Sequence, residues 1–213
     1  MKIRTTLAAG LLSLGLASAA HAAITVQIWT GANAAAANAT IAQAALLGAP
    51  SATTTVAAID FTDAPGNDST TFTVGAFLNN PVGLSSPTGT HVLNNTYFLF
   101  TGQTFLNAGS NSFVVPHDDG LQLNITGIGL VVDQPGPTSP VNTPFTVIAP
   151  TAGLYNFQLS YGETAGGPAV LAFKVNDATV GGVPEPTTWA MLLAGFGMVG
   201  FAMRKRTMGV VAA

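Results

Sequence analysis

The chain has 213 residues, of which only 7% are charged and none is cysteine, so disulfides, thiolate metal sites and cysteine nucleophiles are excluded. Between Ala23 and Pro186 a single basic residue, Lys174, stands against nine acidic residues, which leaves this segment with a net charge of −8. A surface of that sign repels phosphate backbones and attracts cations, so we expect no nucleic-acid binding.

The first 22 residues have the three parts of a secretory signal peptide. Lys2 and Arg4 supply a cationic start, an apolar stretch runs from Leu7 to Ala17, and the segment ends in the small residues Ala20 and Ala22. This order predicts a signal helix over 1–22, with cleavage after Ala22. A buried core helix is the alternative for an apolar stretch of this length.

Residues 23–180 consist mostly of short β-branched and aromatic segments separated by Gly, Pro and Asn. This pattern predicts an all-β fold, an antiparallel β-sandwich. Segment 34–50 is the exception, because its alanines favour a helix ending at Gly48 and Pro50, or else a loosely ordered loop. A proline-rich stretch, 133–144, is expected to be a loop between strands. The expected strands are 24–30, 56–61, 70–77, 95–106, 111–116, 120–127, 153–161 and 170–175.

Apolar and polar residues alternate along the last three of these strands. Because successive side chains of a strand point to opposite faces, such alternation predicts one packed face and one polar face. The residues expected to point inward are Leu121, Leu123, Ile125, Tyr155, Phe157, Leu159, Tyr161, Leu171, Phe173 and Val175.

An acidic turn, Asp118-Asp119-Gly120, precedes the strand 120–127, and the pattern from Tyr155 to Glu163 precedes a glycine-rich turn. With these features, residues 90–177 resemble the lectin-like β-sandwich named after the protective antigen of a bacterial toxin. In sugar-binding members of that group the adjacent aspartates coordinate Ca²⁺, which in turn holds vicinal hydroxyls of a glycan. The resemblance implies a Ca²⁺ site at Asp118 and Asp119, with Glu163 near the position of the family's asparagine ligand. The alternative is a sharp turn without a metal, since Asp and Gly favour turns.

The body contains no recognisable catalytic motif. Only His91 and His117 remain after signal cleavage. Neither belongs to the His-Glu-x-x-His motif of zinc proteases, and the body has no Gly-x-Ser-x-Gly motif of a hydrolase. We expect His117 to be a surface residue. Adjacent aspartates on one strand point to opposite faces, so Asp118 and Asp119 are not expected to form the facing carboxyl pair of a glycoside hydrolase. The sequence therefore predicts a protein that is not an enzyme.

The C-terminal segment combines a short motif, an apolar stretch and a basic cluster. As a helix, the uncharged stretch 187–203 is about 26 Å long, which only just crosses a hydrocarbon core of about 30 Å. The basic cluster would hold residues 207–213 in the cytoplasm. The motif residues are Val183, Pro184, Glu185, Pro186, Trp189 and Ala190, and the cluster is Arg204, Lys205 and Arg206.

This arrangement resembles the PEP-CTERM sorting signal of Gram-negative bacteria, in the variant written PEPxxWA. Residues 181–206 are therefore expected to form a sorting segment that includes a transmembrane helix. A plain single-span anchor is the alternative. The resemblance implies export through the inner membrane, recognition by the transpeptidase exosortase, and a connection with extracellular polysaccharide or biofilm.

Together these features predict a precursor held transiently in the membrane and a processed body at the cell surface or in the extracellular matrix. The expected role of the body is binding or matrix formation, with glycan binding assisted by Ca²⁺. Two alternatives stay open: a structural surface protein retained by its membrane anchor, and a polysaccharide hydrolase.

Overall fold

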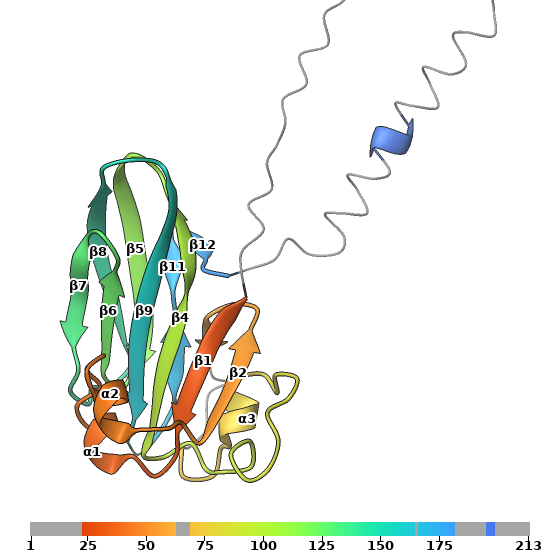
Figure 1. Cartoon of the computed structure of the whole chain (residues 1–213), viewed down its shortest axis with the longest axis vertical. Coiled ribbons are helices and arrows are strands. Elements are labelled where there is room, and N and C mark those ends of the chain that lie inside the picture. The colour runs from red at the N-terminus through yellow and green to blue at the C-terminus, as the bar shows by residue number, and fades with distance from the viewer. Residues whose placement is uncertain (1–22, 63–68, 165, 182–194, 199–213) are drawn as a thin grey trace, which may run out of the picture.

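Two antiparallel β-sheets pack face to face in the computed structural model, which describes residues 23–62, 69–164, 166–181 and 195–198 (Figure 1). The first sheet has the strand order β2-β1-β4-β9-β6-β7. Its strands are β1 (Ile24–Trp29), β2 (Ala52–Val56), β4 (Thr96–Leu106), β6 (Leu121–Ile125), β7 (Gly129–Gln134) and β9 (Gly153–Glu163).

The second sheet is built around β5, which pairs with β8 and, on its other side, with β10 and β11. Strand β3 extends the sheet beyond β10, and β12 extends it beyond β11. Its strands are β3 (Asp60–Thr62), β5 (Gly109–Asp118), β8 (Val141–Ala149), β10 (Val170–Ala172), β11 (Lys174–Val175) and β12 (Ala178–Thr179). The expected all-β antiparallel architecture is confirmed.

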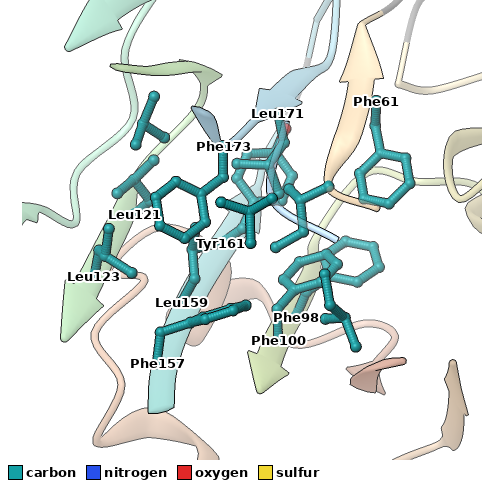
Figure 2. Packing of buried hydrophobic residues seen from close by; sticks show 14 of the residues in the cluster. Phe61, Phe98, Phe100, Leu121, Leu123, Phe157, Leu159, Tyr161, Leu171 and Phe173 are labelled. Carbon is teal, nitrogen blue, oxygen red and sulfur yellow. The ribbon is translucent and has the colours of Figure 1, made fainter. Parts of the chain in front are cut away.

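Aromatic side chains from both sheets fill the space between them (Figure 2). Phe157 of the first sheet meets Phe173 of the second edge to face, with ring centroids 5.4 Å apart. Phe100 and Phe61 form a second contact between the sheets at 5.9 Å. Offset and edge-to-face pairs add stabilisation to the burial of the rings themselves. The body is thus held by packing in a chain that has no cysteine.

The predicted inward faces are confirmed for the apolar positions of β6, β10, β11 and the second half of β9. Leu121, Leu123 and Ile125 are fully buried, and the polar residues between them are partly exposed. Tyr155 differs, because it is only partly buried near the start of β9, where its hydroxyl donates to the carbonyl oxygen of Thr151. The burial of β6 therefore follows the local pattern of its sequence.

Three short helices depart from the sequence-based expectation. Segment 34–50 contains two helices in place of one, α1 (Asn33–Ala36) and α2 (Gln43–Leu47). The expected strand 70–77 is wrong, because its second half is the helix α3 (Val74–Phe77). The Thr73 side chain accepts a hydrogen bond from the backbone of Ala76 and so caps this helix. Phe77 is thereby turned toward the core, where it stacks on Tyr161 at 5.6 Å.

Helices α1 and α2 lie against one end of the first sheet, on its outer face (Figure 1). Ala35 and Ala39 pack there against Trp29, Tyr97 and Leu99. This contact forms a second, smaller core outside the sandwich, and it leaves the other end of the same face uncovered by helices.

The chain leaves the second sheet for the first between Asp118 and Leu121. Asp118 is the last residue of β5 and pairs with Val170, whereas Leu121 begins β6 and pairs with Tyr161 of the first sheet. The acidic turn predicted from the sequence is therefore the crossing between the two sheets.

The membrane-related expectations fall largely outside the described residues. The signal helix 1–22 lies outside them, as does the span 187–203 apart from residues 195–198, which are helical. Within the described ranges, no helix is long and apolar enough to cross a membrane.

Candidate functional site

The acidic pair lines an open cavity of about 390 Å³ at the sheet crossing. Asp118 and Asp119 are largely buried, with 8% and 5% of their surface exposed. The loop after β7 and the loop after β9 form the remaining walls. The lining residues are Asp118, Asp119, Pro137, Thr138, Ser139, Pro140, Thr164, Gly166 and Gly167.

Both loops hold the side chain of Asp119 in place. The backbone N–H of Thr138 donates to Asp119 Oδ1 at 3.1 Å, and the backbone N–H of Thr164 donates to Oδ2 at 2.9 Å. The Thr164 hydroxyl donates a third hydrogen bond, also to Oδ2. Hydrogen bonds of this kind fix the orientation of a carboxylate before a ligand arrives.

Asp118 lies beside Asp119, and both residues line the same cavity. The expectation that they point to opposite faces is wrong, because β5 ends at Asp118 and Asp119 belongs to the crossing, where strand alternation no longer applies. The peptide bond between the two residues is cis. Burial, followed by the negative charge of Asp119, raises the pKa of Asp118 to about 7.

Glu163 stands apart from this cavity. The side chain is 2% exposed and does not contribute to the cavity lining. Its Oε2 lies 2.7 Å from the hydroxyl of Tyr161, and that hydroxyl also bonds the carbonyl oxygen of Asp118. The Tyr161 hydroxyl donates to Oε2, so Glu163 is the acceptor of the hydrogen bond.

The surroundings of Glu163 favour its neutral form. Burial is the main cause that raises the pKa of Glu163 to about 8; the Tyr161 hydrogen bond acts against it, and the charges of the two aspartates act with it. At neutral pH the side chain is therefore mainly neutral. It supports the crossing through Tyr161, and its predicted role as a Ca²⁺ ligand is not supported by its position. Among the described residues, no three His, Cys, Asp or Glu side chains converge as a metal cluster.

His117 is fully buried, so the expectation of a surface histidine is wrong. Its Nδ1 donates to the backbone carbonyl of Asp119 at 2.6 Å, and its Nε2 lies 2.9 Å from the hydroxyl of Thr143 and 3.1 Å from Oε1 of Gln134. These partners satisfy both ring nitrogens inside the protein. The histidine thus holds the backbone of the crossing through the Asp119 carbonyl and does not line the cavity.

Gly120 is required by the tight fit of the crossing. A Cβ atom at this position would overlap the carbonyl oxygen of Pro135 and lie 2.7 Å from that of Gly136. Backbone atoms cannot move aside as a flexible side chain can, so only glycine allows the loop after β7 to approach the crossing.

Sequence reasoning identified the acidic pair but missed the residues that orient it. Thr138 belongs to a proline-rich loop, and Thr164 follows the predicted strand, yet nothing in the sequence joins these loops to Asp119. Their contacts depend on how strands far apart in the chain are arranged. The sorting residues Val183 to Ala190, the basic cluster 204–206 and the cleavage residues Ala20 and Ala22 all lie outside the described residues.

Comparison with known families finds a match at the C-terminus. The family model described as the PEP-CTERM protein-sorting motif matches residues 182–206. The predicted sorting motif is therefore confirmed, and a motif of this kind implies export and association with a membrane or the cell surface. No curated protein matches the chain.

Two solved structures share the fold of the body. The PA14 domain of the antifreeze protein MpAFP aligns with a TM-score of 0.55 and 18% identity, covering 71% of this chain and 80% of that domain. The PA14 sugar-binding domain from an RTX adhesin aligns with a TM-score of 0.52 and 19% identity, covering 76% of this chain and 93% of that domain. The predicted resemblance to this lectin-like β-sandwich is confirmed for the fold.

Proposed function

We propose that this chain is an exported precursor whose PEP-CTERM segment is processed by exosortase, and that the delivered sandwich binds a glycan through Ca²⁺ held by Asp118 and Asp119. The proposed binding role rests on one observation: Asp118 and Asp119 are neighbouring, largely buried acids that line an open cavity. The proposed export and processing are supported by the sorting motif at 182–206. The PA14 fold supports both a binding role and the absence of catalysis.

The donor atoms around the cavity suit Ca²⁺. This ion takes about six to eight hard oxygen ligands, and carboxylates supply both oxygens and negative charge. Thr138 and Ser139, which carry hydroxyl and carbonyl oxygens, also line the cavity. The open side leaves room for water or sugar hydroxyls. A bound Ca²⁺ would offset the repulsion between the two aspartates and present positive charge to vicinal hydroxyls.

A hydrolase is less well supported by the same geometry. Retaining glycosidases place their two carboxyl groups about 5–5.5 Å apart, and inverting enzymes place them farther apart, so that the scissile bond lies between them. Asp118 and Asp119 are neighbours in the chain and line the same cavity, so they are not placed on opposite sides of a sugar ring.

Binding can be tested on an array of short oligosaccharides probed with the full-chain protein. The proposal predicts binding in Ca²⁺ that EGTA removes and that Asp118→Asn abolishes. Asp133→Asn is the matched control, because Asp133 is an exposed acid on β7, away from the cavity. If the array stays silent in Ca²⁺ while the protein is retained at the cell surface, a purely structural role replaces the binding role.

Processing can be tested separately by measuring the intact mass of the exported protein from its own host. A mass that corresponds to a chain ending near Pro186 supports cleavage at the sorting motif. A mass that includes the basic cluster 204–206 would show that the segment serves as a permanent anchor.

A further inference from the structure

The uncovered end of the first sheet presents an uncharged polar surface. In β4 the core residues Phe98 and Phe100 point inward, so Thr101 and Gln103, one and three residues after Phe100, point outward. Helices α1 and α2 cover the outer face only near Trp29, Tyr97 and Leu99. This surface, called the polar face, consists of Thr25, Thr101, Gln103, Thr126, Asn156 and Gln158, all of which line one open hollow of about 570 Å³.

Strand register arranges these side chains in two rows. Thr25, Thr101 and Gln158 lie opposite one another on β1, β4 and β9. Gln103 and Asn156 form the second row, in which Gln103 Nε2 donates to Asn156 Oδ1 at 2.9 Å. Neighbouring strands are about 4.8 Å apart, and alternate residues of one strand about 6.8 Å apart. The rows therefore form a regular grid of hydrogen-bonding groups.

The amide pair of the second row retains the capacity to bind a hydroxyl group. After the bond between them forms, Gln103 keeps its amide oxygen as an acceptor and Asn156 keeps its amide nitrogen as a donor. A sugar hydroxyl is both a donor and an acceptor, so it can bond both groups at once. Next along the same strands, Phe105 and Leu154 lie opposite each other and are 42% and 51% exposed. They offer an apolar contact for a sugar ring beside the polar grid.

The charge of the protein indicates which class of ligand this surface can bind. No residue that lines the hollow is charged, while the segment from Ala23 to Pro186 carries a net charge of −8. An anionic polymer would be repelled by this net charge and would find no cationic side chain in the hollow; among the lining residues, only the α-amino group that cleavage after Ala22 would leave on Ala23 could carry a positive charge. A protein partner is disfavoured because the centre of a protein interface is normally apolar and aromatic, whereas the centre of this face is polar.

We propose that the polar face is a second binding site, which takes an extended segment of an uncharged polysaccharide without Ca²⁺. It is distinct from the acidic cavity, because that cavity lies before the first residue of β6 and Thr126 follows the last. Strand β6 has five residues and separates the two by about 17 Å. The proposal rests on different residues from the Ca²⁺ site and does not require that site to function.

Affinity electrophoresis of the full-chain protein in EGTA tests this proposal. The gels contain hydroxyethyl cellulose, laminarin, dextran or galactomannan as neutral polymers, or alginate as the anionic polymer. We expect retardation by at least one neutral polymer and none by alginate. The double variant Gln103→Ala with Asn156→Ala should weaken the dissociation constant at least fivefold, and Gln158→Ala should weaken it by a smaller factor. The matched control is Asn142→Ala with Thr146→Ala, two exposed polar residues of β8 in the other sheet.

Each outcome decides between the two sites. Retardation that persists in EGTA, survives Asp118→Asn and is lost in the Gln103 and Asn156 double variant supports the polar face. Retardation that EGTA or Asp118→Asn abolishes assigns polymer binding to the acidic cavity and overturns this inference. Retardation by alginate, unchanged retardation of the double variant, or no retardation in any neutral gel also overturns it. Because the substituted residues are surface residues, near-ultraviolet circular dichroism should show an unchanged fold.

Discussion

Asp118 and Asp119 line the same cavity, although one ends a strand of the second sheet and the other begins the crossing to the first. Two acids in one largely buried place repel each other unless a proton or a cation lies between them. The surrounding contacts hold this arrangement from several sides, with His117 on the Asp119 carbonyl and Thr138 and Thr164 on its carboxylate. A site that retains such repulsion is one that a divalent cation would stabilise.

Gly120→Ala should destabilise the fold, because the new Cβ would overlap the backbone carbonyl of Pro135. Overpacking of this kind costs about 1–3 kcal/mol of the free energy of unfolding. Urea unfolding of the full-chain protein measures the loss. Gly136→Ala is the matched control, since a Cβ there meets nothing within 4 Å, and it should change stability by less than about 1 kcal/mol. Equal effects of the two substitutions would contradict the steric account.

The raised pKa of Glu163 makes stability depend on pH in a defined direction. The folded protein holds this proton up to about pH 8, whereas the unfolded chain loses it near 4.5. The folded state thus binds more protons between these values, and its stability falls as pH rises from 4.5 to 8. Below 4.5 the contribution is fully present, and above 8 it is lost.

Glu163→Gln should remove this part of the pH dependence, because the amide stays neutral and its oxygen can still accept from the Tyr161 hydroxyl. In EDTA, the free energy of unfolding of the variant should match that of the wild type near pH 5 and exceed it by about 4 kcal/mol near pH 8.5. Urea titrations at the two pH values measure the difference. Parallel pH profiles for both proteins would show that Glu163 is ionised in the folded state at neutral pH.

Thr164→Val tests how far the loop after β9 prepares Asp119 for a ligand. The substitution removes the hydroxyl that donates to Oδ2 but keeps the backbone donor of the same residue. Loss of one supporting hydrogen bond is worth about 1 kcal/mol, so we expect Ca²⁺ affinity to fall about fivefold without a change in stoichiometry. Thr146→Val, an exposed position on β8, serves as the control. An unchanged affinity would mean that the hydroxyl does not orient Asp119.

The parts of the fold that the sequence predicts are those governed by local alternation. Leu121, Leu123 and Ile125 occupy one face because a strand has a period of two, whatever it pairs with. Segment 70–77 shows the limit of this rule: its β-branched residues favour a strand, yet Thr73 caps a helical turn. Packing of Phe77 on Tyr161, far along the chain, accompanies that outcome.

In the candidate site, too, the local features could be predicted from the sequence and the long-range contacts could not. The acidic turn and its glycine are adjacent in sequence and could be identified there. Their partners Thr138 and Thr164 come from loops that meet the turn only after β5 and β6 are placed in different sheets. The burial of His117 likewise depends on Gln134 and Thr143, which belong to separate strands. Such contacts are tertiary, so no local sequence pattern predicts them.

Calorimetric titration of the full-chain protein with Ca²⁺ at pH 7.4 tests the central claim most directly. We expect one Ca²⁺ per chain, with a dissociation constant of about 10⁻⁴ M, as in extracellular modules. Asp118→Asn should weaken binding at least tenfold, while Asp133→Asn, which removes an equal charge from exposed β7, should leave it unchanged. No saturable heat from the wild type, or equal binding by the Asp118→Asn variant, would contradict the claim that this carboxyl pair is a Ca²⁺ site.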